Sequence, residues 1–500
     1  MGIAMQLDLD RRSPTPLHLQ IAQQIRLMIL QGELAEGSRL PPTRKLAEIL
    51  GVNRSTVVQA YNKLWAEGLI ESHVGRGTVV RRVEAAVEFP VSSLSWETLL
   101  ATRFEAIESG VRELMKLFAE DEVISFAAGL PASEHYPLEE FTGLFYELLT
   151  QQGRLILGRC AVEGHPGLRE WIAKELAGGI SPNEILILSG SQQGLYLLTQ
   201  ALLEPGDTIV VEAPTYMGAL SAFRAVGARL IGVPVDEKGM NVAVLERVLA
   251  RTRPKFIYTV PTFQNPSGAT LSLERRRKVL ELAYRYHVPV VEDDPYSLLR
   301  YEGEALPSLK VLDAYGYVIH LSTFSKLLFP GLRVGWLAAP KGVIEKLAPL
   351  KRVMDLFTNA PGQAVLYEFC RRGLLSCHLE GVREEYRRGR NVMAKALTEQ
   401  LPKLRWQLPE GGFFIWSRLP RGVSGRALLR EATREGVTFL PGEFFFADGQ
   451  GQEWVRLTFV SQPPELIEEG MRRLARAVRR VMRRKQQEVQ EKTAATRPIV

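Results

Sequence analysis

The sequence is poor in cysteine and contains no long apolar run. Its three cysteines, Cys160, Cys370 and Cys377, are odd in number and are not arranged in metal-binding pairs, which argues against a disulfide framework and a zinc site. No stretch of about eighteen apolar residues occurs, and residues 1–30 lack the apolar core of a signal peptide. These absences favour a cytoplasmic protein with neither a membrane span nor a bound metal.

Charge of one sign is not in large excess either, since the 500 residues carry a net charge of +7. A hydrophobic fraction of 46% and a charged fraction of 24% are typical of soluble globular proteins, and the length predicts two or three domains. Basic residues gather in residues 1–80 and again in residues 472–485. In the second cluster Leu474, Val478 and Val481 recur at helical spacing, which indicates a solvated surface helix. A basic face that gathers phosphates is the alternative.

Three short helices and a hairpin are predicted near the N-terminus. From Leu17 onward apolar residues recur every four positions, as on one face of a helix. Pro42 suits the start of a second helix, Gly51 the turn after it, and Asn53 the cap of a third. Residues 69–80 then alternate as in a β-hairpin. Together these elements predict a winged helix-turn-helix.

In that motif the second helix of the pair enters the major groove with its first residues against the base edges. Arg54 can make a bidentate contact with guanine, and the hydroxyls that follow it can reach bases or phosphates. Arginines around the preceding helix suit phosphate contacts, and the wing tip suits the minor groove. The predicted DNA-contacting residues are Arg39, Arg44, Asn53, Arg54, Ser55, Thr56, Gly75 and Arg76. A winged helix that serves only as a protein–protein module is the alternative.

The stretch LPPTRKLAEILGVNRSTVVQAYNKLWAEGLI, followed by HVGRGTVV, resembles the GntR family of bacterial regulators. The resemblance covers roughly residues 15–81 and includes spacing as well as composition. It implies that Arg44, Arg54, Thr56 and Gly75 fall on positions that the family uses for DNA. Double-stranded operator DNA is therefore an expected partner.

Beyond this region, strand-like runs alternate with helical stretches. The clearest predicted strands are residues 184–189, 208–213, 255–260, 288–293 and 317–323. Such alternation predicts an α/β fold with a mainly parallel sheet, helices on both faces, and ligands in the loops after the strands. The predicted organisation is a DNA-binding domain over residues 13–82, a linker over 83–96, a ligand-binding domain over 97–485 and a C-terminal tail over 486–500. Within the third part we expect a three-layer large domain of roughly residues 150–370, with a smaller α+β domain formed from segments on either side.

A candidate cofactor site begins in the segment STFSKLLFPGLRVGW. Lys326 follows the hydroxyls of Thr323 and Ser325 and precedes Arg333, whose planar guanidinium matches a phosphate group. An aldehyde cofactor that is held on a lysine as a Schiff base needs such an anion site beside it. The context therefore favours a cofactor lysine over an ordinary surface lysine.

Three further segments supply the rest of that site. Asp293 lies just past a predicted strand end, where it can pair with a protonated pyridine nitrogen. Asn265 and Tyr296 can donate hydrogen bonds to the phenolic oxygen of the same ring. Further candidates open a helix, whose first amides favour phosphate, or stack on the ring: Ser191, Gln192 and Tyr216.

In this order the segments resemble the fold-type I aminotransferases, particularly the aspartate and aminoadipate aminotransferase branch. The resemblance covers about residues 124–456 and implies pyridoxal 5'-phosphate as the cofactor. It implies that Lys326 is the Schiff-base and catalytic lysine, Asp293 the pyridine partner and Arg333 the phosphate arginine. Arg456 falls where the family binds the α-carboxylate of a substrate or effector.

The two halves in this order resemble the MocR subfamily of GntR regulators. The resemblance implies a homodimer in which pyridoxal phosphate, alone or with an amino acid or amine effector, alters operator binding. A working aminotransferase that carries a DNA-binding domain is the second reading, and a scaffold that binds neither ligand is the third. Where the family usually has a tyrosine that reaches the partner subunit's cofactor phosphate, this sequence has Arg159. An arginine can meet that phosphate but lacks the neutral hydroxyl, so the sequence leaves sensor and enzyme both open.

Overall fold

The computed structural model describes residues 7–11, 13, 15–73, 77–81, 96, 99 and 123–495. The chain divides into two compact units, Met1–Leu99 and Leu100–Val500. The wing-tip residues Gly75 and Arg76 lie outside the described residues, as does the predicted linker except for its last residue. Of the helices that the structure describes, none combines the length and the apolar character needed to cross a bilayer.

The N-terminal unit is a winged helix-turn-helix, as predicted. Its elements are α1 (Leu17–Leu30), α2 (Thr43–Leu50), α3 (Arg54–Ala66), β1 (Ile70–His73) and β2 (Gly77–Val80). The two strands pair antiparallel, with Ile70 opposite Val80. Gly51 takes a φ of 60° at the end of α2, a left-handed conformation that glycine adopts without strain. A core of its own, which includes Ile25, Leu46 and Leu64, holds the three helices together.

An eight-stranded sheet forms the centre of the second unit. Its order is β4-β11-β10-β9-β8-β5-β6-β7, and the run from β10 to β6 is parallel while β11 and β7 are antiparallel to their neighbours. The mainly parallel sheet that the sequence predicts is therefore confirmed. The strands are β4 (Ile185–Leu188), β5 (Thr208–Ala213), β6 (Arg229–Asp236), β7 (Gly239–Met240), β8 (Ile257–Thr259), β9 (Val290–Asp293), β10 (Val318–Thr323) and β11 (Gly335–Ala338).

Helices cover both faces of this sheet. Alternate residues of β4 pack on opposite sides, because side chains of a strand alternate between its two faces. Ile187 joins the core that contains Val365 of α13, whereas Leu188 joins the core that contains Leu195 of α7. The covering helices are α5 (Leu138–Ile156), α6 (Pro166–Glu175), α7 (Ser191–Leu202), α8 (Met217–Ala225), α9 (Val242–Arg251), α10 (Leu273–Tyr286), α11 (Leu309–Leu312), α12 (Lys341–Asp355) and α13 (Ala360–Arg371). Short 3₁₀ turns occur at Ser133–His135, Pro182–Glu184, Pro330–Leu332 and Gly442–Phe445.

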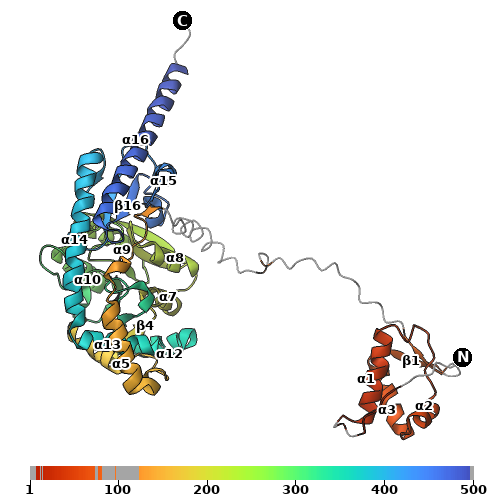
Figure 1. Ribbon diagram of the computed structural model, residues 1–500. Coiled ribbons are helices and arrows are strands. Elements are labelled where there is room, and N and C mark those ends of the chain that lie inside the picture. The colour runs from red at the N-terminus through yellow and green to blue at the C-terminus, as the bar shows by residue number, and fades with distance from the viewer. Residues whose placement is uncertain are drawn as a thin grey trace. The chain divides into compact units, whose positions relative to one another are not determined.

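A smaller α+β domain is assembled from chain segments on either side of the large one. Its four-stranded sheet has the order β12-β13-β16-β15, and a separate parallel pair joins β3 to β14. Helices α14 and α16 lie side by side along it (Figure 1). Its elements are β3 (Ile124–Ser125), α14 (Leu374–Gln400), β12 (Arg405–Trp406), β13 (Phe414–Arg418), α15 (Gly425–Arg434), β14 (Val437–Thr438), β15 (Leu440–Pro441), β16 (Trp454–Thr458) and α16 (Pro464–Ala495).

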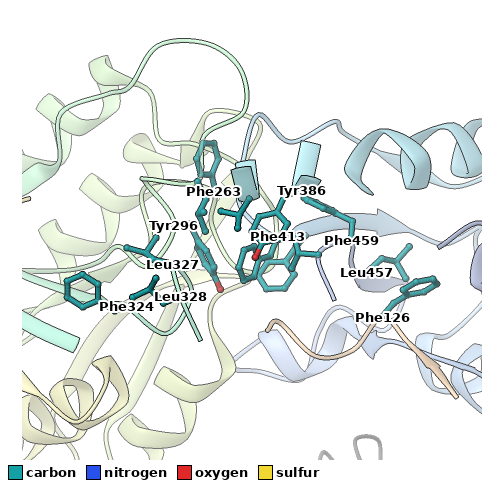
Figure 2. Packing of buried hydrophobic residues seen from close by; sticks show 14 of the residues in the cluster. Phe126, Phe263, Tyr296, Phe324, Leu327, Leu328, Tyr386, Phe413, Leu457 and Phe459 are labelled. Atoms are coloured by element: carbon teal, nitrogen blue, oxygen red, sulfur yellow. The ribbon is translucent and has the colours of Figure 1, made fainter. Parts of the chain in front are cut away.

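One hydrophobic core runs through both domains of this unit. The rings of Tyr296 and Phe413 lie 5.2 Å apart where the two domains meet. Figure 2 shows this core, with Phe324, Leu327 and Tyr296 from the large domain and Phe126, Phe413 and Leu457 from the smaller one. This packing holds the loop that follows β9 against the start of β13.

The basic segment near the C-terminus lies on α16. Leu474 and Val478 are buried, so the helical spacing predicted there is confirmed. Most of its arginines pair with glutamates of α15, of the residue after it, or of α16 itself: Arg472 and Arg473 with Glu469, Arg476 with Glu435, Arg480 with Glu431 and Glu435, and Arg484 with Glu431. The helix continues past Lys485 to Ala495, into the predicted tail, because glutamine, glutamate, lysine and alanine favour helix and no glycine or proline intervenes.

Candidate functional site

A cavity of about 520 Å³ opens where the carboxyl ends of β5, β8, β9 and β10 face the smaller domain. Its volume falls within the range of roughly 300 to 1,000 Å³ that is typical of small-molecule sites. The predicted residues that line it are Ser191, Tyr216, Asn265, Asp293, Tyr296, Thr323, Lys326 and Arg456. The other lining residues are Ser125, Ala128, Gly129, Leu130, Met217, Val260, Pro295, Phe414 and Thr438. Residues that lie far apart in the sequence, such as Gly129 and Lys326, therefore line the same cavity.

Lys326 lies in the turn after β10, and its Nζ donates a hydrogen bond to the Gly129 carbonyl at 2.7 Å. Burial lowers the pKa of this lysine to about 8, and the positive charges of Arg456 and Arg333 lower it further in the same direction. At pH 7 roughly one amine in ten with such a pKa is neutral, far more than for an ordinary lysine with a pKa of about 10.4. It is therefore suited to act as a nucleophile or to exchange protons.

Asp293 ends β9 and is only 3% exposed. Its Oδ2 accepts a hydrogen bond of 2.7 Å from the Tyr258 hydroxyl, while Oδ1 is buried without a hydrogen-bond partner among the described residues. Burial raises the pKa of this carboxyl to about 6, and the neighbouring Asp294 also raises it. A buried carboxylate oxygen without a donor is costly, so this geometry fits a ligand that brings an N–H group or a positive charge to Oδ1.

Arg456, on β16, is the cation of the opposite wall and is 3% exposed. Its Nη1 donates to Asn265 Oδ1 at 2.9 Å and its Nη2 donates to the Ala127 carbonyl at 2.5 Å. The guanidinium carbon lies 4.1 Å from the centre of the Phe414 ring, and Nε is buried without a partner in the described part of the chain. Burial lowers the pKa of Arg456 to about 10. No carboxylate of the described residues forms an ion pair with this guanidinium, and a buried guanidinium in that situation suits an anionic ligand.

The first turn of α7 forms the end of the cavity that favours anions. Ser191 is its first residue, and the preceding Gly190 has a φ of 88°. Arg333 Nη2 donates to the Ser189 carbonyl at 3.0 Å, and a Cβ on Gly190 would lie 2.6 Å from that nitrogen. Glycine is therefore required there for the arginine to approach the helix start. Backbone amides and a guanidinium together make a phosphate site.

The remaining predicted residues surround this end of the cavity or its aromatic wall. The Tyr216 hydroxyl donates to Gln192 Oε1 at 3.2 Å, and burial raises the pKa of that tyrosine to about 12. Thr323 Oγ1 accepts from the Ser325 backbone amide at 3.2 Å. Tyr296 is 2% exposed and packs in the aromatic core. Gln192, Ser325 and Arg333 do not line the cavity themselves.

Arg159 lies elsewhere. It lines a separate cavity of about 430 Å³ together with Cys160, Glu163 and Arg352. Within one copy of the chain it does not line the larger cavity.

Sequence reasoning did not single out Gly129, Tyr258 and Phe414. Tyr258 lies in an apolar run that reads as an ordinary buried strand, and its only signal is a hydroxyl in that run. Gly129 and Phe414 come from the two segments of the smaller domain, whose distance from Lys326 in sequence hides their proximity. A search for polar groups in buried strands would have found the tyrosine.

The candidate DNA face lies at the start of α3 in the N-terminal unit. Asn53 is the N-cap, and its side chain accepts from the Ser55 backbone amide at 3.3 Å. Of the predicted residues, Arg39, Arg44, Asn53, Arg54 and Ser55 are exposed and Thr56 is half-buried. Val57 and Leu64 on the opposite side of α3 are fully buried. The helix is thus anchored by one side while its first polar residues face solvent.

Comparison with known proteins matches both units. Residues 121–474 match the family described as aminotransferase class I and II, and residues 17–80 match the bacterial regulatory proteins of the gntR family. Aromatic-amino-acid aminotransferase 1 of Thermococcus litoralis is 39% identical over 81% of this chain and 99% of its own length. The probable rhizopine catabolism regulatory protein MocR of Rhizobium meliloti is 29% identical over 94% of this chain and 95% of its own length. Among solved structures, the chain is similar to LysN, the α-aminoadipate aminotransferase of Thermus thermophilus, in a crystal structure complexed with N-(5'-phosphopyridoxyl)-L-leucine. The TM-score is 0.74 and the sequence identity is 39%, and the match covers 78% of this chain and 99% of LysN.

Proposed function

We propose that this chain, which belongs to the aminotransferase class I and II family, is a ligand-responsive transcriptional regulator. It carries a GntR-family DNA-binding domain at its N-terminus, as MocR-type regulators do. Its larger domain would sense pyridoxal phosphate, an amino acid or an amine, and the protein would act in the cytoplasm on operator DNA. The observation that carries the proposal is the pairing, in one chain, of the exposed start of α3 with a cavity that holds Lys326, Asp293 and Arg456.

Pyridoxal phosphate is the cofactor of this family, and the cavity fits it. When bound, it supplies an electron sink that stabilises negative charge on the α-carbon of an amino acid. Asp293 Oδ1, which is buried without a hydrogen-bond partner among the described residues, suits the role of pyridine partner, and the lowered pKa of Lys326 favours covalent attachment. We assign the phosphate to Ser191, Gln192, Thr323, Ser325 and Arg333, and the ring to Tyr216, Asn265, Asp293 and Tyr296.

The charged residues of the cavity have different proposed roles, which follow from the sign of their charges. Asp293 holds a proton on the ring nitrogen, since a carboxylate beside a cation keeps its charge. Arg456 binds the α-carboxylate of the amino acid with its planar guanidinium. The Lys326 amine, whose pKa is lowered to about 8, holds or moves a proton at the α-carbon.

Regulation requires that ligand binding change the arrangement of the DNA-binding units. A ligand can do this only if it binds two arrangements of the protein with different affinities. We propose a homodimer as the responsive species, because two winged helices reading two half-sites then depend on the dimer's geometry.

An active aminotransferase is the second candidate, because the cavity combines lysine, aspartate and arginine as catalysis needs. The matched enzymes from Thermococcus and Thermus cover about four fifths of this chain. Incubation of the cofactor-loaded protein with amino acids and 2-oxo acids distinguishes the two. Sustained formation of new amino acid favours the enzyme, while retention of the ligand without turnover favours the regulator.

The experiment that tests the proposal is a titration of the full-length protein on the DNA upstream of its own gene, at fixed salt, with and without pyridoxal phosphate. We expect the affinity or the footprint to change when the cofactor is added. An operator affinity that is the same with and without the cofactor, and with and without added amino acids, would overturn the ligand-responsive part of the proposal. Absence of specific binding under every condition would overturn the DNA-binding part and favour the enzyme.

Replacement of Arg54 by alanine should weaken specific operator binding by about 1–3 kcal/mol, the usual contribution of a bidentate contact with a base. Arg54 is the first residue of α3 and is exposed, so its removal should not disturb the core of the winged helix. The measurement is a DNA titration of the variant against operator and unrelated sequence. Arg247, an exposed arginine of α9 in the other unit, gives a matched control as Arg247→Ala. Equal operator affinity of wild type and Arg54→Ala would remove Arg54 from the interface.

The rate at which the protein takes up pyridoxal phosphate should rise with pH and level off above a pH of about 8. Only the neutral lysine amine attacks an aldehyde, and the pKa of Lys326 is lowered to about 8 by burial and by two arginines. An ordinary lysine, with a pKa of about 10.4, would give a rate that climbs well beyond that point. The visible absorbance of the protein-bound cofactor follows the uptake at each pH. A rate that keeps climbing to a pH of about 10 would show that the amine lies in an ordinary aqueous environment.

A further inference from the structure

Glu212 is a buried carboxylate that the proposed chemistry does not use. It lies near the end of β5, is 2% exposed and does not line the cavity. In the part of the chain that the structure describes, no lysine or arginine forms an ion pair with it. A buried carboxylate without a cation is costly to folding, so its presence is not explained by packing alone.

Three donors converge on this carboxylate. Glu212 Oε1 accepts from the Thr259 hydroxyl at 2.6 Å. Its Oε2 accepts from the Val260 backbone amide and from Gln264 Nε2, each at 3.1 Å. Burial raises the pKa of Glu212 to about 7, and these hydrogen bonds oppose the rise. The carboxylate therefore links the end of β5 to the segment that follows β8.

Gln264 connects Glu212 to the turn that contains Asn265. Its Nε2 also donates to the Pro214 carbonyl at 2.6 Å, and its Oε1 accepts from the backbone amide and the hydroxyl of Ser267 at 2.8 and 2.6 Å. The Gln264 carbonyl accepts from the Gly268 amide at 2.7 Å. One side chain thus braces the turn from both sides.

The residues just before this turn are also held by Arg276 of α10, which is fully buried. Its Nη2 donates to the Pro261 carbonyl at 3.0 Å and to the Thr262 hydroxyl at 2.8 Å. Asn265, the residue after Gln264, accepts at Oδ1 from Arg456 Nη1 at 2.9 Å. The position of Asn265, and through it that of Arg456, depends on how firmly the turn is held.

We infer that Glu212 is a positioning residue that holds Asn265 in the cavity by way of Gln264. The inference rests on the proposed role of Asn265 in holding the cofactor. A methionine at position 212 has nearly the length of glutamate but no acceptor oxygen. The Thr259 hydroxyl, the Val260 amide and Gln264 Nε2 would each lose this acceptor, so the link to the turn would be removed.

The test is a double-substitution cycle on the full chain, read by cofactor titration through its visible absorbance. Glu212→Met and Asn265→Ala should each weaken the cofactor affinity by about 10-fold, the size expected when a buried hydrogen bond is left unmade. If Glu212 acts through Asn265, the double variant should be no weaker than Asn265→Ala alone. Asp313→Leu is the matched control, since that carboxylate also accepts from a hydroxyl and from backbone amides but lies away from the cavity. Its affinity should equal that of the wild type.

Each outcome decides a different point. If the two effects multiply in the double variant, Glu212 does not act through Asn265 and the inference is overturned. If Asn265→Ala alone leaves the affinity unchanged, the proposed role of Asn265 is overturned, and the inference with it. Should Glu212→Met fail to fold, Gln264→Met removes the same link from its other end and should reproduce the loss of about 10-fold. Unchanged affinity in a folded Gln264→Met variant would overturn the inference.

Discussion

Replacement of Lys326 by alanine is expected to abolish covalent attachment of pyridoxal phosphate, and with it the visible absorbance of the lysine-bound cofactor. No other lysine lines the cavity among the described residues. Borohydride reduction of the loaded wild type should fix the cofactor on the peptide that contains Lys326, and mass spectrometry should find no such product in the variant. Lys341→Ala is the control, because that lysine is exposed on α12 and pairs with Glu345 at 3.7 Å. Cofactor fixed on another lysine of the Lys326→Ala variant would show that the assignment is wrong.

The same substitution should not destabilise the protein. Burial lowers the pKa of Lys326, which means that the fold disfavours its charged form. Its removal leaves the Gly129 carbonyl without that donor, a small loss against the relief of a desolvated amine. The unfolding temperature of the variant should therefore equal or exceed that of the wild type without cofactor. Because the winged helix has its own core, the variant should also keep its non-specific affinity for DNA.

The local parts of the fold could be predicted from the sequence, whereas the pairings between distant segments could not. The strands around Val210 and Val290 are short apolar runs bounded by polar turns, and the pattern was sufficient to find them. By contrast, β3 pairs with β14 across some three hundred residues, and each contributes only two residues. So short a strand has no periodicity of its own. Its partner is decided by tertiary packing.

The residues of the candidate site also fall into those that the sequence predicts and those that it does not. Lys326, Asp293 and Asn265 stand in motifs whose residue types and spacing already indicate their chemistry, and all three line one cavity. Glu212 and Tyr258 have no such signal, because a carboxylate or a hydroxyl at the end of a buried strand is informative only when its neighbours are known. The sequence thus indicated the groups that would contact a ligand better than the groups that hold them in place.

Replacement of Arg456 by methionine is expected to weaken amino-acid binding to the cofactor-loaded protein by about 100-fold, the loss of charge-assisted hydrogen bonds to a carboxylate. Methionine keeps the apolar stem against Phe414 but lacks the guanidinium. The affinity is measured from the change in cofactor absorbance as an amino acid is added. Arg418→Met is the matched control, since Arg418 lies on the adjacent strand β13, is 46% exposed and pairs with Glu453 at 3.2 Å. That variant should bind as the wild type does.

A second effect of Arg456→Met separates a lost carboxylate contact from a collapsed site. The charge of Arg456 lowers the pKa of Lys326, so its removal should raise that pKa above about 8. The pH at which cofactor uptake levels off should then move upward, while a damaged cavity would instead lose uptake at every pH. Arg456→Lys keeps the charge without the planar fork, so it should retain the wild-type pH profile yet still bind amino acids more weakly. An amino-acid affinity of Arg456→Met within a few-fold of the wild type would mean that the carboxylate binds elsewhere, and an unchanged pH profile would mean that the two cations do not interact across the cavity.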